Sequence, residues 1–323
     1  MTQGSFTGRR EEDWKELERI IAGGPALLKE KTAWFPQAFR KLTGDLNTAR
    51  SNGFDPSLID RLNRLTMEGN HLLYDREPFS PRVFSAFILE TFPRAVRTRW
   101  RSFWACFLIF YGLALFSACI CIRFPDFVFQ LMSGRETAGL ESMYDPGGPY
   151  YLKPREVKTD ADMFGYYIYN NIGIAFRIFG GGLLAGIGSI LLLGFNGIFI
   201  GAAAAHIINR GFQDTFFSFV IGHSPFELTG IILSAQGGLM LGYRLFVTRG
   251  LTRGESLREA GRTALPIIAG SALMLVIAAA IEAFWSSRHE IPQGIRYGTG
   301  AALIVLVILY FTCAGRRLWK KRP

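Results

Sequence analysis

The sequence predicts an all-α, polytopic membrane protein with about six transmembrane helices, a short re-entrant or interfacial helix and an N-terminal cytoplasmic helical bundle. Of the 323 residues, 49% are hydrophobic, and the mean hydropathy is +0.20. Residues 163–243 carry almost no charge over about eighty positions, whereas one bilayer crossing requires only about 20 apolar residues. The formal charge of +10 is concentrated in Arg and Lys clusters beside apolar segments, which is typical of cytoplasmic flanks.

Residues 1–98 are predicted to form the cytoplasmic helical module. Apolar residues at intervals of three or four predict one helix that stops at Gly23-Gly24-Pro25, a second over residues 34–50 and a third that begins at Asp55-Pro56-Ser57. The N-terminal residues are polar and lack an apolar run, so no cleaved signal peptide is expected.

Residues 99–315 are predicted to form the transmembrane domain, followed by a basic cytoplasmic tail over residues 316–323. Arg-rich segments before the first span, in the 247–264 loop and in the tail place both termini in the cytoplasm. The predicted spans are residues 102–122, 170–193, 198–209, 227–246, 265–285 and 297–313, with an external segment over residues 123–162. A tight turn at Gly194-Phe195-Asn196-Gly197 separates the second span from the third, and residues 213–222 form the short re-entrant or interfacial helix.

Six glycines stand in pairs four residues apart: Gly182 and Gly186, Gly197 and Gly201, Gly238 and Gly242. This spacing places small surfaces on one helix face and lets helix backbones approach closely. The sequence therefore predicts tight helix packing at these positions, within one chain or between chains of a homo-oligomer.

The segment His223-Ser-Pro-Phe-Glu227 places two ionisable groups four residues apart in an apolar neighbourhood. One interpretation is structural, because Ser224 as N-cap, Pro225 and Glu227 match a capping box that opens the next helix. The other is functional, since ionisable groups are costly in hydrocarbon and mark proton, ion or substrate sites.

Four more polar residues complete the predicted intramembrane site. Asn170 and Asn171, at the entrance of a span, either cap that helix or form hydrogen bonds to a neighbouring helix. Asn196 is explained by the predicted turn, because asparagine is a common turn residue. For the charge of Arg177 we expect one of two arrangements. Its side chain extends to the outer membrane surface, or its guanidinium pairs with Glu227 or Asp214. The predicted polar site is thus Asn170, Asn171, Arg177, Asn196, His223 and Glu227.

Several classes of site are not expected. The four cysteines lie in apolar segments, and Cys119 and Cys121 point to different helix faces, which makes a poor metal site. Phosphate-binding, dinucleotide-binding, nucleophile-elbow and HExxH patterns do not occur. We therefore expect no catalytic residues, no metal, no cofactor and no nucleic-acid partner, and we expect that the protein is not an enzyme.

Two stretches resemble a known family. The sequence NNIGIAFRIFGGGLLAGIGSILLLGFNGIFIGAAAAH, followed by FFSFVIGHSPFELTGIILSAQGGLMLGYRL, resembles the signature of the stage II sporulation protein M family of bacterial membrane proteins. The segment FRKLTGDLNTARSNGFDPSLIDRLNRLTMEGNHLLYDRE resembles the helical part that precedes the first span in longer members. The family pattern falls on Asn170, Asn171, Phe176, Gly182, Gly186, Gly188, Asn196, Gly197, Gly201, Phe219, His223, Glu227 and Gly242. The chain departs from the pattern at Ser224, where the family has a glycine.

The resemblance implies a multi-pass protein of the bacterial cytoplasmic (inner) membrane that contacts membrane lipids and serves as a non-enzymatic scaffold of a cell-envelope complex. In spore formers the family resembles a platform for partners that degrade peptidoglycan. Longer members are often encoded near MoxR-type AAA+ ATPases and von Willebrand A-domain proteins, which implies partners of those kinds. The alternative is a transporter or channel for an ion or small solute, with a polar site around His223 and Glu227.

Overall fold

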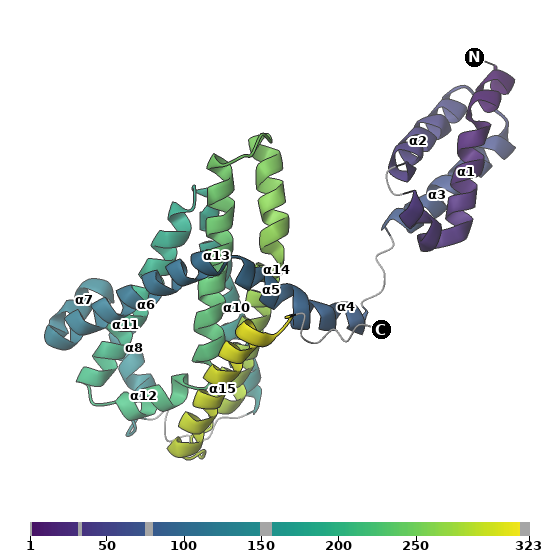
Figure 1. The fold of residues 1–323 in the computed structure, drawn as a ribbon. Helices are drawn as coiled ribbons and strands as arrows, with labels where there is room; N and C mark the ends of the chain where they lie inside the picture. The colour runs from purple at the N-terminus through teal and green to yellow at the C-terminus, as the bar shows by residue number, and fades with distance from the viewer. Residues whose placement is uncertain (1, 32–33, 75–79, 149–156, 317–323) are drawn as a thin grey trace. The chain divides into compact units, whose positions relative to one another are not determined.

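The computed structural model describes residues 2–31, 34–74, 80–148 and 157–316. These residues form helices and no strand, which confirms the all-α fold class (Figure 1). The chain divides into two compact units, Met1–Ser80 and Pro81–Pro323. We call them the N-terminal unit and the membrane unit.

The N-terminal unit consists of three helices, α1 (Gln3–Glu30), α2 (Phe35–Ser51) and α3 (Pro56–Tyr74). Their apolar stripes meet in one core that includes Trp14, which is fully buried. The predicted stop at Gly23-Gly24-Pro25 is a kink instead. Gly24 has φ 65° and ψ −155°, which breaks the helical bonding locally, and the chain resumes as helix to Glu30.

Buried polar contacts hold the three helices in register. Asp45 of α2 accepts hydrogen bonds from Trp14 Nε1 at 2.9 Å and from Arg10 Nε at 2.9 Å, both from α1. Arg61 of α3 donates to Glu11 at 3.0 Å and to Glu18 at 2.8 Å, and these carboxylates raise the pKa of its guanidinium. Such paired, part-buried charges specify one arrangement of the helices.

The membrane unit also contains residues 81–98, which precede the predicted start of the transmembrane domain at residue 99. The segments α4 (Pro81–Ala86), η1 (Phe87–Thr91) and α5 (Phe92–Thr98) precede the first apolar helix. Phe92 is 2% exposed and packs in one cluster with Met240 and Ile267. Gly270 makes room for it, because a Cβ there would overlap the Phe92 ring. The packing of Phe92 thus joins this segment to the membrane unit.

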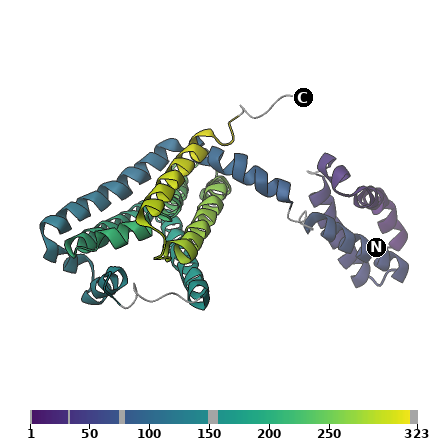
Figure 2. The ribbon, with the colours of Figure 1, turned by 90° about the horizontal axis from the view of Figure 1, so that it is seen from below.

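The rest of the membrane unit consists of further helices, some of them short. Their bounds are α6 (Trp100–Arg123), η2 (Pro125–Phe127), α7 (Val128–Leu131), α8 (Gly134–Tyr144), α10 (Val157–Gly180), η3 (Gly181–Leu183), α11 (Ile187–Asn209), α12 (Gln213–Val220), α13 (Ser224–Phe246), α14 (Arg253–Ile281), η4 (Glu282–Ser286) and α15 (Gln293–Cys313). The helix α6 packs along α11, and α13 packs along α14 (Figures 1 and 2).

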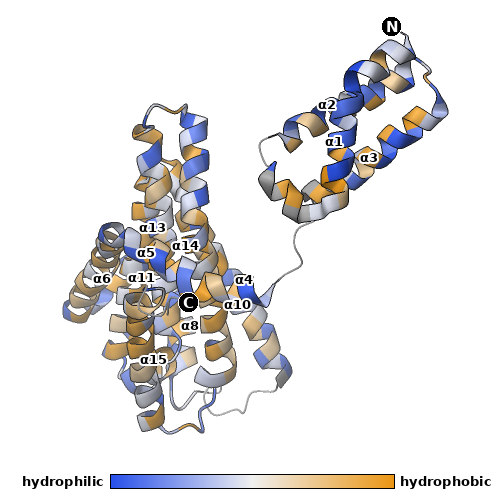
Figure 3. Cartoon of the chain, turned by 45° about the vertical axis from the view of Figure 1, so that its right-hand side comes forward, coloured by the Kyte–Doolittle hydropathy of each residue, from blue (hydrophilic) through white to orange (hydrophobic). Residues whose placement is uncertain are grey.

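Among the described residues, four helical stretches are long and apolar enough to cross a membrane: α6, α11, α14 with η4, and α15. A fifth span results if α12 and α13, which meet at a bend of 67°, cross as one broken helix. Large apolar side chains are exposed on these helices, including Leu115 of α6, Leu191 of α11 and Leu306 of α15. Hydrophobic residues predominate along the helices of the membrane unit (Figure 3). The chain is therefore a helical membrane protein, with four or five candidate spans where the sequence predicted about six.

The predicted turn at Gly194-Phe195-Asn196-Gly197 is wrong, because these residues lie in the middle of α11. Asn196 Nδ2 donates to the carbonyl of Leu192 at 2.8 Å, a bond within the helix rather than in a turn. The break falls at Leu184–Gly186 instead, where Ala185 and Gly186 have positive φ angles of 58° and 82°. The predicted spans 170–193 and 198–209 are therefore replaced by α10 and one continuous α11.

All six paired glycines lie where another backbone or a small side chain approaches. A Cβ at Gly182 would overlap Gly238, one at Gly238 would overlap Ser189, and one at Gly242 would overlap Gly186. On the α6 side, a Cβ at Gly197 would meet the Phe110 carbonyl, and one at Gly201 would overlap the Ala114 carbonyl. The contacts fall within this chain, so close packing of its own helices accounts for these glycines.

Candidate functional site

The candidate site lies where the chain bends between α12 and α13. His223 is the residue before α13, and its carbonyl accepts the first helical bonds from Phe226 at 3.0 Å and Glu227 at 3.1 Å. Ser224 is already inside the helix, and no side chain caps this helix end. The capping box predicted around Ser224 is therefore wrong, which frees the Glu227 side chain for other contacts.

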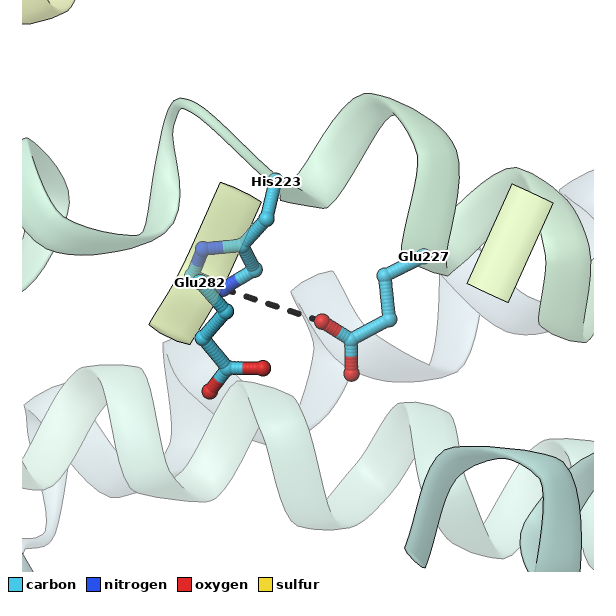
Figure 4. Close-up of side chains that lie close together, drawn as sticks. All are labelled: His223, Glu227 and Glu282. Carbon is cyan, nitrogen blue, oxygen red and sulfur yellow. Dashed lines mark ion pairs between the residues drawn. The ribbon is translucent and has the colours of Figure 1, made fainter. Parts of the chain in front are cut away.

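His223, Glu227 and Glu282 form a cluster of polar side chains, which we call the polar cluster (Figure 4). Nε2 of His223 lies 3.7 Å from Oε2 of Glu227, one helical turn further along α13. Glu282 is the first residue of η4. Each of the three residues offers one atom that could bind a metal ion, and these three atoms all lie within 4.8 Å of one another. His223 is 4% exposed, and both carboxylates are partly exposed. A basic nitrogen and two carboxylates thus converge in an apolar unit.

Two features of η4 bring Glu282 to this position. The segment is a π-helical turn that continues α14, and such turns insert an extra residue and re-aim the side chains near them. At the end of η4, the hydroxyl oxygen of Ser286 lies 3.1 Å from Nδ1 of His223. Gly222 permits this approach, because a Cβ there would overlap the ring of Trp285. The absence of a side chain at Gly222 therefore allows the bend to contact η4.

Arg296, near the start of α15, holds the elements around the polar cluster. It is 3% exposed and donates to the carbonyls of Ile291 at 3.1 Å, Ser286 at 3.2 Å and Arg288. A longer contact of 3.5 Å reaches the carbonyl of Ser218 in α12. A buried guanidinium with five donors can satisfy several carbonyls at once, so Arg296 joins α12, η4 and α15.

A cavity of about 360 Å³ lies beside the polar cluster. Tyr144, Phe219, Ser287 and Arg296 are among its lining residues, and the ring of Phe219 lies edge-on to His223 with centroids 5.3 Å apart. Burial raises the pKa of the Tyr144 phenol, and the charges of Glu282, Tyr167 and Glu227 raise it further. The cavity therefore adjoins the cluster and is of a size that holds a small solute or several waters.

The other four polar residues of the sequence prediction make hydrogen bonds within their own helices. Asn170 Nδ2 donates to Asn171 Oδ1 at 3.1 Å in α10, and Nδ2 of the buried Asn171 has no hydrogen-bond partner among the described residues. Arg177 is exposed and donates to the Gly173 carbonyl at 3.1 Å. The ion pairs of the described residues do not include one from Arg177 to Glu227 or Asp214.

Of the predicted polar residues, therefore, His223 and Glu227 come together, and Asn196 is explained by its bond inside α11. Sequence reasoning missed Glu282. A signal was present, because Glu282 lies inside the apolar stretch predicted as the span 265–285, and an acidic residue there is itself a marker of function. The sequence analysis also predicts no metal site. Within the described part of the chain, however, the polar cluster supplies three side chains that are able to hold one metal ion together.

Comparison with protein families gives two matches. The model of the stage II sporulation protein M family matches residues 102–287, which include α6, the bend at His223 and η4. A domain of unknown function, DUF8413, matches residues 4–75, which correspond to the N-terminal unit. Neither the curated proteins nor the solved structures contain a match. Because the first match covers more than half of the chain and contains the polar cluster, this protein belongs to the stage II sporulation protein M family.

Proposed function

We propose that the protein is a non-enzymatic membrane scaffold of a cell-envelope complex, and that its N-terminal unit recruits partner proteins. The observation that carries the proposal is that residues 1–80 fold around a core of their own, and a domain family separate from that of the membrane unit matches them. A unit with its own core is a module that can serve as a docking domain.

Charge supports a protein partner for this module. Residues 1–80 contain as many Lys and Arg residues as Asp and Glu residues, so the formal charge of +10 belongs to residues 81–323. A neutral module gains little from anionic lipid headgroups, which attract basic segments. One side of α3 presents the exposed residues Asp60, Arg64, Met67, Glu68 and His71, which offer charges of both signs and an apolar centre for docking.

The test is purification of the tagged full-length protein from its native membrane in mild detergent, with mass spectrometry of whatever accompanies it. Deletion of residues 1–80 should remove stoichiometric partners, whereas deletion beyond residue 80 would also disturb the packing of Phe92. MoxR-type AAA+ ATPases and von Willebrand A-domain proteins are the partners that the family context suggests. Purification without any stoichiometric partner would contradict the scaffold proposal.

A matched pair of surface variants sharpens this test. Arg64→Glu with Met67→Ala alters the exposed side of α3, and Lys41→Glu makes a comparable charge change on exposed α2. We expect the α3 variant to lose its partners, the α2 variant to keep them, and both to remain folded. Loss of partners in the α2 variant but not in the α3 variant would place the docking face elsewhere on the unit.

A second function has an observation in its favour. The polar cluster and the adjoining cavity are costly features inside an apolar unit, as expected for a transporter or channel of an ion or small solute. The test is flux of protons and of small cations into vesicles that contain the purified protein. Flux that is lost in Glu227→Gln, while the variant still purifies as a folded protein, would support this function over the scaffold.

A further inference from the structure

We infer that His223, Glu227 and Glu282 bind one divalent transition-metal ion, with zinc as the best fit, and that the ion fastens the start of α13 to the π-helical turn η4. The inference goes beyond the scaffold proposal and does not depend on it. An imidazole nitrogen and two carboxylates form a donor set that suits zinc and similar ions. Three protein ligands leave a fourth position for water.

The separation of His223 and Glu227 argues for an ion between them. Nε2 and Oε2 lie 3.7 Å apart, which exceeds the roughly 2.7–3.2 Å of a direct N–H···O hydrogen bond. Two atoms that each bond to one zinc ion at about 2.0–2.2 Å lie up to about 4.3 Å apart. The observed separation is therefore too long for a direct bond and falls in the range of two ligands of one ion.

The third ligand comes from another helix and completes a compact set. One oxygen of Glu282 lies within 4.8 Å of the ligand atoms of His223 and Glu227, so modest rotations of these side chains would bring all three ligand atoms within bonding distance of one ion. In Figure 4 the carboxyl groups of Glu227 and Glu282 and the ring of His223 face a common space. Binding at this point would link α13 to η4 across residues that are far apart in the sequence.

The surroundings of His223 support its role as a ligand. Its other ring nitrogen, Nδ1, lies 3.1 Å from the Ser286 hydroxyl. When Nδ1–H donates to that oxygen, the lone pair of Nε2 points to the carboxylates. Metal-binding histidines are oriented in this way by a hydrogen bond at the second nitrogen.

The site is also open to loading. Glu227 and Glu282 are partly exposed although His223 is buried, so an ion can reach the carboxylates first. The cavity of about 360 Å³ adjoins the cluster at Phe219, whose ring contacts His223, and at Ser287, the residue after Ser286. A metal site needs such a path, in addition to suitable ligands and a satisfied outer partner.

The test uses the full-length protein in detergent, stripped with a chelator and then loaded with zinc ions alone. Bound zinc per chain is measured by elemental mass spectrometry, and affinity is measured by competition with a metal indicator. We expect about one zinc per chain for the unmodified protein. His223→Ala, Glu227→Gln and Glu282→Gln should each weaken binding by more than about 100-fold, and Ser286→Ala should weaken it by about 10–100-fold.

Glu141→Gln is the matched control. Glu141 accepts from His206 at 2.8 Å and from Arg210 at 2.9 Å, so it also pairs with a histidine but lies outside the polar cluster. It should keep the affinity of the unmodified protein. Equal zinc binding in all of these variants, or less than about one tenth of a zinc ion per chain in the unmodified protein, would overturn the inference.

X-ray absorption at the zinc edge tests for one artefact, the binding of zinc to cysteine. The expected first shell contains nitrogen and oxygen at about 2.0–2.2 Å, whereas a sulfur shell at about 2.3 Å would show binding to cysteine and would overturn the assignment. Cys119 and Cys313 are exposed and are the relevant competitors. If a cluster variant fails to fold, the unmodified protein still tests the inference, because a sulfur shell or the lack of bound zinc would overturn it.

Discussion

Nδ1 of His223 lies 3.1 Å from the hydroxyl oxygen of Ser286, and this contact joins the bend before α13 to the π-helical turn at the end of α14. The two residues are far apart in the sequence, and neither lies in a motif that links them. Arg296 holds the same turn through the Ser286 carbonyl at 3.2 Å. The arrangement of the polar cluster therefore depends on contacts between helices, which leads to the first prediction.

Replacing Arg296 by methionine should destabilise the membrane unit. The change leaves the carbonyls of Ile291 and Ser286 without their donor, and each buried unsatisfied acceptor costs about 1–3 kcal/mol. We expect a clearly lower Tm of the purified protein in detergent. Arg258→Met removes an exposed arginine from α14 and should leave the Tm nearly unchanged. Equal Tm values for the two variants would show that Arg296 does not hold these elements.

Gly201→Ala should disturb the packing of α11 against α6. An added Cβ would overlap the Ala114 carbonyl, and overpacking of this kind costs about 1–3 kcal/mol. The control is Gly112→Ala in α6, because a Cβ there meets nothing within 4 Å. Thermal unfolding in detergent compares the two, and a Gly112→Ala loss as large as that of Gly201→Ala would contradict the packing argument.

Residues 1–80 should fold when produced without the membrane unit. Their core is closed around Trp14, which is 0% exposed, and its indole donates to Asp45 at 2.9 Å. Trp14→Ala should cost about 3–5 kcal/mol, a large part of the total stability of a small domain. Met67→Ala, at a side chain that is 58% exposed, should change little. Circular dichroism with chemical denaturation measures both, and an unfolded 1–80 fragment would refute the prediction.

The stability of the 1–80 fragment should fall in acid partly through Asp55. Its carboxylate accepts hydrogen bonds from the side chain and backbone of Ser57 at the start of α3, and these bonds lower the pKa of Asp55. A lowered folded-state pKa means that the stabilisation is complete above the unfolded-state pKa of about 3.9 and is lost as the pH falls through the folded-state pKa.

Asp55→Asn should therefore flatten the dependence of unfolding free energy on pH between about pH 5 and pH 2. Asp60→Asn is the control, since Asp60 is an exposed acid in the first turns of α3 whose carboxylate accepts no hydrogen bond from the described residues. Denaturant titrations across this pH range provide the measurement. If Asp55→Asn and unmodified fragment show the same slope, the Ser57 contacts do not stabilise the fold.

Periodicity alone predicted most helices of the N-terminal unit. The apolar stripes of α2 and α3 matched the expected segments within a few residues, because their spacing is that of a helix with one buried face. The same reasoning failed at Asn196 and Gly197. Two glycines and an asparagine favour a turn locally, but the apolar residues on both sides continue α11, and Gly197 and Gly201 serve as contact points for α6.

The sequence by itself determined that this is an all-α membrane protein of its family, since apolar run length, glycine spacing and the residues around His223 are local patterns. It also determined that His223 and Glu227 share one side of a helix start. Only the tertiary structure decided that Glu282 joins them, that Phe92 belongs to the membrane unit and that the chain breaks at Ala185 and Gly186. The physical reason is that these features depend on contacts between distant segments, and periodicity reports only which face of a helix is buried.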